Sequence, residues 1–246
     1  MDMESFNRST LKGFFQKGKV PTEVHFANLI DSTINKVDDG LSKTPEYGLR
    51  LTPGDKNQRV LSFFGEPKDY KPQWSIGVNP VHNVNGLAIN NEQDDTKLFL
   101  KKDGGIGINT LYPRADLDIN GTLASSSRMG TYSKNNEVPA DGEWHTIISQ
   151  LSSCHVFEVV AKVSGVKNRG KYAISHAIAL SAEGGRKSKI RVTQAAYGWF
   201  WHKLRFRWKY QEDGDYALQL KTQSHYGTDE NEEVIQVSFH VTSLWK

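Results

Sequence analysis

The chain has 246 residues, of which 37% are hydrophobic, and a single cysteine, Cys154. One cysteine excludes an internal disulfide framework and a cysteine-based zinc site, and no run of about 18 apolar residues is present to span a membrane. The net charge of +3 is uneven, with 15 basic against 16 acidic side chains in residues 1–127 and 16 against 12 in residues 128–246.

Residues 1–47 predict one amphipathic helix after an irregular start. In the stretch TEVHFANLIDSTINKVDDGL, we expect Thr22 to be the N-cap and Gly40 to stop the helix. Five apolar residues have the 3-4-3-4 spacing of a coiled coil, and isoleucine at both positions favours three or more strands. They are Ala27, Ile30, Ile34, Val37 and Leu41. Because two heptads are too few to decide, the alternative is a single amphipathic helix packed on its own domain.

Residues 48–127 contain four short strings of the form apolar-x-apolar-Asn, which predict short strands that end in turns. The strings are IGVN at 76–79, LAIN at 87–90, IGIN at 106–109 and LDIN at 117–120. Between them, KLFL at 97–100 predicts a strand that runs into a turn at Asp103 and Gly104. Strands this short bury little alone, so we expect a β-shaft stabilised by stacking within or between chains. The alternative is an ordinary β-domain with an accidental repeat.

Residues 128–246 predict a compact all-β domain, a sandwich or a jelly roll. Turn signals separate seven candidate strands, at 144–149, 155–163, 172–181, 189–195, 200–209, 216–222 and 234–242. The strand at 200–209 alternates most regularly. We expect one of its faces to lie in the core, namely Phe200, His202, Leu204, Phe206 and Trp208. The other face predicts a basic ladder toward solvent or a partner, made of Trp201, Lys203, Arg205, Arg207 and Lys209.

The candidate ligand-binding residues are Tyr197, Trp199 and Trp201, which surround Gly198, together with Arg205 and Arg207. Aromatic rings bring a large contact area with few rotatable bonds, and arginine binds carboxylates or phosphates bidentately. The alternative is that these aromatic side chains fill the core or a subunit interface. The acidic run at 229–233, with Asp213 and Asp215, argues against nucleic acid as a partner.

No catalytic signature is present: the sequence has no GxSxG, HExxH or P-loop motif. Neighbours on a strand point to opposite faces, so Cys154 and His155 do not form a nucleophile–base pair, and we expect Cys154 to be buried and inert. Carboxylates that a glycosidase would need are present, most of them in apparent turns: Glu158, Glu183, Asp213 and Asp215. Six histidines, at 145, 155, 176, 202, 225 and 240, lack HxH or HxxxH spacing. We therefore expect no enzymatic activity, no cofactor and no metal.

Two stretches resemble known fibre proteins. The segment GGIGINT at 104–110, followed by PRADLDING at 113–121, resembles the "GIGT…P…LDVNG" element of phage tail-fibre and bacterial surface-fibre proteins, with Asn109 and Ile119 as mild departures. The segments KVPTE at 19–23 and HFANLIDS at 25–32 are similar to the N-terminal helix of fibre-like proteins of phage tails and extracellular contractile injection systems. The C-terminal half resembles the distal β-domain of some of these proteins at RMG (128–130), ADGEWH (140–145) and VTQ (192–194).

This resemblance implies a homotrimeric attachment fibre that is mostly β. Residues 1–47 would trimerise and dock on a phage-tail or injection-particle protein, residues 48–127 would form an intertwined β-shaft, and residues 128–246 would form a β-sandwich or jelly-roll-like head. The head would bind a cell-surface glycan or protein. The alternatives are a structural adaptor of such a particle (a baseplate, cap or tube-associated protein) and, third, a carbohydrate-active enzyme. The N-terminus, MDMESFNRST, lacks the features of a signal peptide. We therefore expect a component of an extracellular particle that is made in the cytoplasm and does not insert into a membrane.

Overall fold

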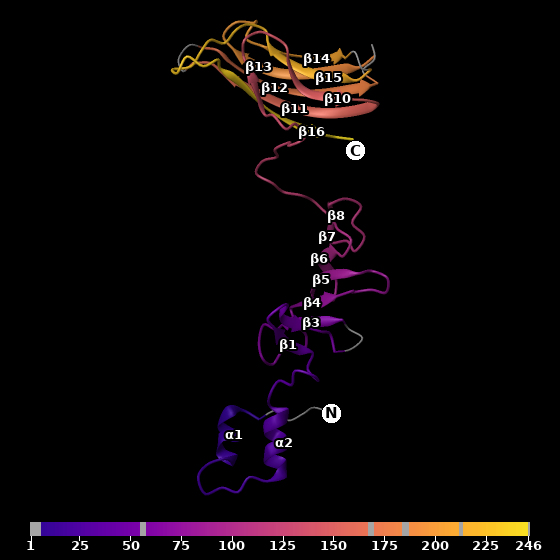
Figure 1. Cartoon of the computed structure of the whole chain (residues 1–246), viewed down its shortest axis with the longest axis vertical. Helices are drawn as coiled ribbons and strands as arrows, with labels where there is room; N and C mark the ends of the chain where they lie inside the picture. Colours follow the sequence, from indigo (N-terminus) through magenta and orange to yellow (C-terminus); the bar gives the residue numbers. More distant parts are fainter. Residues whose placement is uncertain (1–5, 55–57, 167–169, 184–186, 212–213, 246) are drawn as a thin grey trace. The chain divides into compact units, whose positions relative to one another are not determined.

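The computed structural model describes residues 6–54, 58–166, 170–183, 187–211 and 214–245. The chain divides into two compact units, Met1–Ala124 and Ser125–Lys246 (Figure 1). Within the described residues, two short helices and eight strands belong to the first unit, and eight strands belong to the second. The prediction of a mostly-β fold with a short N-terminal helix is thus confirmed. No helix of the described residues has the length and apolar character that crossing a membrane requires.

The N-terminal residues form two short helices, α1 (Arg8–Phe14) and α2 (Glu23–Asp31). Helix α1 lies in a stretch for which we predicted irregular structure. Thr22 is the N-cap of α2, as predicted, and forms a capping box in which its backbone N–H donates to Nδ1 of His25 at 3.1 Å. Neither helix has a buried residue.

Helix α2 ends at Asp31 and does not continue to Gly40, so the predicted length of this helix is wrong. Ser32 and Thr33 donate their hydroxyls to helix carbonyls behind them, at 2.6 and 2.8 Å. The side chain of Asn35 accepts hydrogen bonds from two backbone N–H groups ahead of it, at 2.8 and 3.3 Å. These local bonds offer the backbone an alternative to the helix, and they explain why the helix stops.

The proposed coiled-coil stripe is therefore not continuous. Ala27 and Ile30 lie on α2, Ile34 and Val37 lie in the irregular segment that follows, and Leu41 begins strand β1 (Leu41–Thr44). Strand β1 pairs with β2 (Gly48–Leu51) in a two-stranded hairpin. The heptad interpretation of this stripe is wrong, because its last three positions are not helical.

The four repeated strings of the first unit lie in a six-stranded sheet whose strands follow one another in chain order (Figure 1). The strands are β3 (Arg59–Phe63), β4 (Trp74–Val78), β5 (Gly86–Asn91), β6 (Thr96–Lys101), β7 (Ile106–Ile108) and β8 (Leu117–Ile119). All neighbours are antiparallel except β7 and β8, which are parallel. Asn79 and Asn109 end their strands with φ of 51° and 55°, the left-handed region that asparagine tolerates. The four predicted strands are thus confirmed, and Asn79, Asn109 and Asn120 lie just beyond their strands as predicted, whereas Asn90 lies inside β5 and the turn predicted there is wrong.

The two faces of this sheet differ in what covers them. One face carries a small core of Val84, Ala88 and Phe99, against which Leu111 packs. The central positions of the opposite face all carry apolar side chains. These side chains lie opposite one another on neighbouring strands, as Ile76 does with Ile89. We call this face the apolar ladder, and it comprises Leu61, Phe63, Trp74, Ile76, Val78, Leu87, Ile89, Leu98, Leu100, Ile106, Ile108, Leu117 and Ile119. None of these side chains is fully buried.

The second unit is a β-sandwich made of a five-stranded and a three-stranded antiparallel sheet (Figure 1). In spatial order, the five-stranded sheet is β13 (Lys189–Tyr197), β12 (Tyr172–Ala182), β11 (Cys154–Ser164), β16 (Gln236–Ser243) and β9 (Glu137–Pro139). The three-stranded sheet is β10 (His145–Leu151), β15 (Tyr216–Thr222) and β14 (Leu204–Tyr210). All seven predicted strands are present, and β9 is an addition. One buried cluster joins both sheets, for example Phe157 and Phe239 of the first with Leu218 of the second.

The segment that enters this sandwich is fixed along strand β16. Thr131 forms a parallel bridge with Val241, and the N–H of Tyr132 donates to the carbonyl of Val241 at 2.9 Å. Gly130 lies so close to Val241 that a Cβ atom would have no room there. Arg128 forms an ion pair with Glu158 on the neighbouring strand β11.

Candidate ligand-binding surfaces

An exposed aromatic turn connects β13 to β14. We define it as Tyr197, Trp199, Phe200 and Trp201, which surround Gly198. Gly198 has a φ of 97°, and a Cβ atom would approach the carbonyl of Gly170 to 2.6 Å, so a side chain is excluded there. The predicted strand at 200–209 begins only at Leu204. Phe200 is therefore exposed in the turn, and its predicted place in the core is wrong.

The aromatic turn is held by hydrogen bonds from buried groups. His202 is buried, and its Nδ1 accepts the backbone N–H of Trp199 at 3.2 Å. The hydroxyl of Tyr226 donates to the carbonyl of His202 at 2.8 Å, and burial raises the pKa of Tyr226 to about 12. The hydroxyl of Ser224 donates to the carbonyl of Trp201 at 3.2 Å. These bonds fix the backbone beneath rings that face solvent.

Three rings of the aromatic turn pack against one another, and two of them are stacked. Trp199 and Trp201 are parallel within 3°, with centroids 5.3 Å apart, and Phe200 lies 4.2 Å from Trp201. The exposed fractions are 63% for Trp199, 64% for Phe200 and 37% for Trp201. Large apolar rings that gather on a surface mark an interaction site more often than scattered ones do.

The structure does not bring the five candidate ligand-binding residues together in one site. Tyr197 lies on the outer face of the five-stranded sheet, opposite Tyr172 in the strand register. Arg205 and Arg207 lie on the outer face of the three-stranded sheet, because Leu204, the buried first residue of β14, faces the core on the other side. The two outer faces are on opposite sides of the sandwich. The aromatic turn connects the sheets that carry them.

The outer face of the three-stranded sheet is basic. We call it the basic sheet face, and it comprises Arg205, Arg207, Lys209, Lys221 and Trp144. The guanidinium carbon of Arg207 lies 4.1 Å from the centroid of the Trp144 ring, and the Nζ of Lys221 lies 5.0 Å from it. Trp144 and Lys221 were not among the site residues predicted from the sequence. Lys221 could have been found from the sequence, because it lies on β15, the strand that follows and pairs with the basic strand β14. Nothing in the sequence placed Trp144 over these cations.

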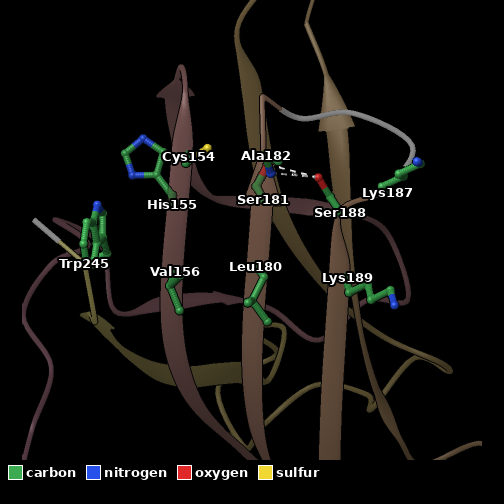
Figure 2. A pocket seen from close by; sticks show the side chains of 10 residues that line it. All are labelled: Cys154, His155, Val156, Leu180, Ser181, Ala182, Lys187, Ser188, Lys189 and Trp245. Carbon is green, nitrogen blue, oxygen red and sulfur yellow. Dashed lines mark hydrogen bonds between the residues drawn. The ribbon is translucent and has the colours of Figure 1, made fainter.

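A shallow groove of about 440 Å³ lies where β12 ends and the neighbouring strands β11 and β13 begin (Figure 2). Figure 2 shows Val156 and Leu180 side by side on neighbouring strands, with Trp245 on one flank and Lys189 on the other. Cys154 lines this groove and is exposed, so its predicted burial is wrong. Cys154 stands at the first position of β11, on the outer face, where no core residue covers it.

Histidine and carboxylate side chains that were considered for catalysis or metal binding form contacts within the sandwich. His155 lies on the core face of β11, stacked on Phe157, and does not share a face with Cys154. Glu158 is paired with Arg128 and with Nε2 of His176, the latter at 2.9 Å. Among the described residues, no group of three histidine, cysteine or acidic side chains is placed to hold a metal ion. The candidate carboxylate Asp213 lies outside the described residues.

No protein-family model and no curated protein matches the chain.

Proposed function

We propose that the chain is a non-enzymatic attachment protein, a homotrimeric fibre of an extracellular particle that binds a cell-surface glycan or protein through its C-terminal unit. The observation that carries the proposal is the aromatic turn, in which the rings of Trp199, Phe200 and Trp201 are exposed above a backbone fixed by buried His202 and Tyr226. The resemblance to phage-tail and injection-system fibres supports the same function.

A fixed aromatic surface is suited to binding because little conformational freedom remains to be lost. Association loses roughly 0.5–1.5 kcal/mol for each flexible side chain that becomes ordered. The stacked rings of Trp199 and Trp201 are already ordered against each other before a ligand arrives. Tryptophan dominates the residues whose removal most weakens interfaces, and its flat ring suits the apolar face of a sugar as well as a protein surface.

The apolar ladder supports the proposed trimer. It spans all six strands of the sheet in the first unit, and its side chains include exposed Phe63, Trp74 and Leu117. Monomeric proteins rarely leave so continuous an apolar face in water. Burial of the ladder against the same face of two further copies removes it from solvent, and the weak core on the other side of the sheet favours such stacking.

Docking on a carrier particle through residues 1–47 remains part of the proposal. The two helices have no buried residue, and they expose Val24, Phe26 and Ile30. An amphipathic helix gains most of its stability from packing on a partner. A phage-tail or injection-particle protein is the partner that the resemblance implies.

The test of the binding function uses the full chain on a glycan array and on whole cells. We expect the double substitution Trp199→Ala and Trp201→Ala to weaken binding by about 30-fold, the loss typical of a central aromatic contact. The control is Tyr112→Ala, which removes a similarly exposed ring from the first unit and leaves binding unchanged. If the trimer forms and binds neither cells nor any glycan, the proposal fails. If the double variant instead prevents particle assembly, the structural adaptor is the correct function.

A further inference from the structure

We infer that the basic sheet face is a second binding surface, and that its ligand is an acidic polysaccharide. The inference rests on the proposed attachment function for the source of this ligand and deepens it by naming a ligand class. The surface is distinct from the aromatic turn, because its cations lie on the sheet while the turn precedes strand β14.

All charged side chains of the basic sheet face are positive. Strands β10, β14 and β15 contain no aspartate or glutamate, whereas Arg205, Arg207 and Lys209 alternate along β14. Side chains two residues apart on a strand are separated by roughly 6.5–7 Å, so these three cations form a row with a regular spacing. A polymer with repeated anionic groups matches such a row better than a single small anion does.

The fold holds this charge together at a cost in stability. Lys221 lies directly opposite Arg205 in the strand register, and like charges in that position destabilise a sheet. Within the described part of the chain, none of the four cations takes part in an ion pair. A local arrangement that places like charges together without an opposite charge between them is expected where function requires it.

Neutral side chains orient the cations without reducing their charge. Gln219 is buried, accepts a hydrogen bond from Nε of Arg207 at 2.8 Å and donates to Oγ1 of Thr146 at 3.0 Å. Gln223 accepts more distant hydrogen bonds from Arg205 at 3.4 Å. The Trp144 ring adds an apolar plate against which Arg207 and Lys221 rest. The arrangement fixes the guanidinium of Arg207 for bidentate contact with a carboxylate or sulfate.

These features favour a polysaccharide over a nucleic acid. Single-stranded nucleic acids bind to rows of aromatic side chains on which successive bases stack. The basic sheet face has one ring, Trp144, and two cations already lie against it. The amide of Gln223 and the hydroxyl of exposed Thr146 lie among the cations, which suits a ligand with hydroxyl groups between its charges.

The experiment measures binding of the full chain to dextran sulfate, with neutral dextran of equal length as the reference. We expect salt-sensitive binding to dextran sulfate only, because a polyanion releases counterions when cations bind it. The double substitution Arg205→Gln and Lys209→Gln should weaken this binding at least about 10-fold and flatten its salt dependence. The matched control is Lys189→Gln with Arg191→Gln, an equal charge change on the outer face of the five-stranded sheet, which should change binding less than about twofold.

Three results overturn the inference. Equal losses in both double variants mean that net charge alone attracts the polymer, and tighter binding of single-stranded DNA with the same number of charges means that the ligand class is wrong. The proposed function is tested separately by the aromatic-turn variant, which should still bind dextran sulfate. If the chain binds cells but not dextran sulfate, the inference fails and the attachment function stands. If the basic sheet face binds dextran sulfate while no cell or glycan-array binding is found, the attachment function fails and the anion-binding surface stands.

Discussion

The two units bury their apolar side chains in opposite ways. Among the residues that the structure describes, the second unit encloses 21 buried residues in one cluster between two sheets. In the described part of the first unit, the buried cluster comprises Val84, Ala88 and Phe99, while the apolar ladder on the other face of its sheet remains accessible. The difference indicates that the sandwich is stable as a single chain, whereas the six-stranded sheet depends on whatever covers its ladder.

The largest expected effect comes from emptying the small core of the first unit. Phe99→Ala removes its one large, fully buried ring, so we expect a loss of about 3–5 kcal/mol in the unfolding free energy of that unit alone. Calorimetry should show the first unit unfolding earlier while the transition of the sandwich keeps its temperature. Phe239→Ala is the matched change in the sandwich core and should have the reverse effect. A common shift of both transitions would show that the units unfold as one.

A charge on the apolar ladder tests whether other copies cover it. Ile89 lies at the middle of the ladder, between Ile76 and Leu98 in register. We expect Ile89→Asp to destabilise assembly by at least about 2 kcal/mol per chain, because an unpaired charge would be buried. Light scattering should then give the mass of one chain, 27.7 kDa, in place of three. Asn85→Asp adds the same charge at an exposed position and should leave the trimer intact. A ladder variant that stays trimeric would exclude this face as the interface.

A smaller effect is expected when the aromatic turn loses its support. Tyr226→Phe removes the hydrogen bond to the carbonyl of His202 and should destabilise the sandwich by about 1 kcal/mol. Hydrogen exchange of the Trp199 amide should become faster, and ligand affinity should fall several-fold because the rings are less ordered. Tyr210→Phe, on an exposed side chain, is the control and should change neither. Unchanged exchange in Tyr226→Phe would show that the turn does not depend on this bond.

The smallest effect concerns the loop between β7 and β8, where Arg114 holds Asp118. The guanidinium of Arg114 and its backbone N–H donate to the carboxylate, which lowers the pKa of Asp118 to about 2. Because the folded pKa is below the unfolded one, this contribution is complete above about pH 4 and is lost as the pH falls toward 2. NMR titration should show the pKa of Asp118 rising toward 3.8 in Arg114→Gln, but not in Arg59→Gln. An Asp118 pKa that stays low in Arg114→Gln would contradict the assignment.

Strands were the predictable part of this fold because their pattern is local. The strand at 216–222 has the same bounds in the structure as in the prediction, and the four apolar-x-apolar-Asn strings all became strands or strand ends. Helix length was not predictable from apolar spacing, because the side chains of Ser32, Thr33 and Asn35 compete for the backbone of α2.

The binding surfaces were harder to predict than the strands. The regular alternation at 200–209 concealed a turn, because Gly198 and buried His202 reverse the chain before Leu204. Residue types alone indicated that Trp199 and Arg207 could bind a ligand. Their separation onto a turn and a sheet face depends on strand register, and the position of Trp144 over Arg207 depends on tertiary packing.

The way in which the chain enters the sandwich has a mechanical consequence. A fibre of the proposed function, which would hold a cell to a particle, would be pulled along its backbone, and the pull would reach the sandwich through the residues that precede Tyr132. The parallel bridge from Thr131 to Val241, the close fit of Gly130 and the ion pair of Arg128 with Glu158 pass that force into two adjacent strands, β16 and β11. Tension is thereby shared among several bonds at the centre of the larger sheet, and the aromatic turn and the basic sheet face lie on elements that do not receive the load directly.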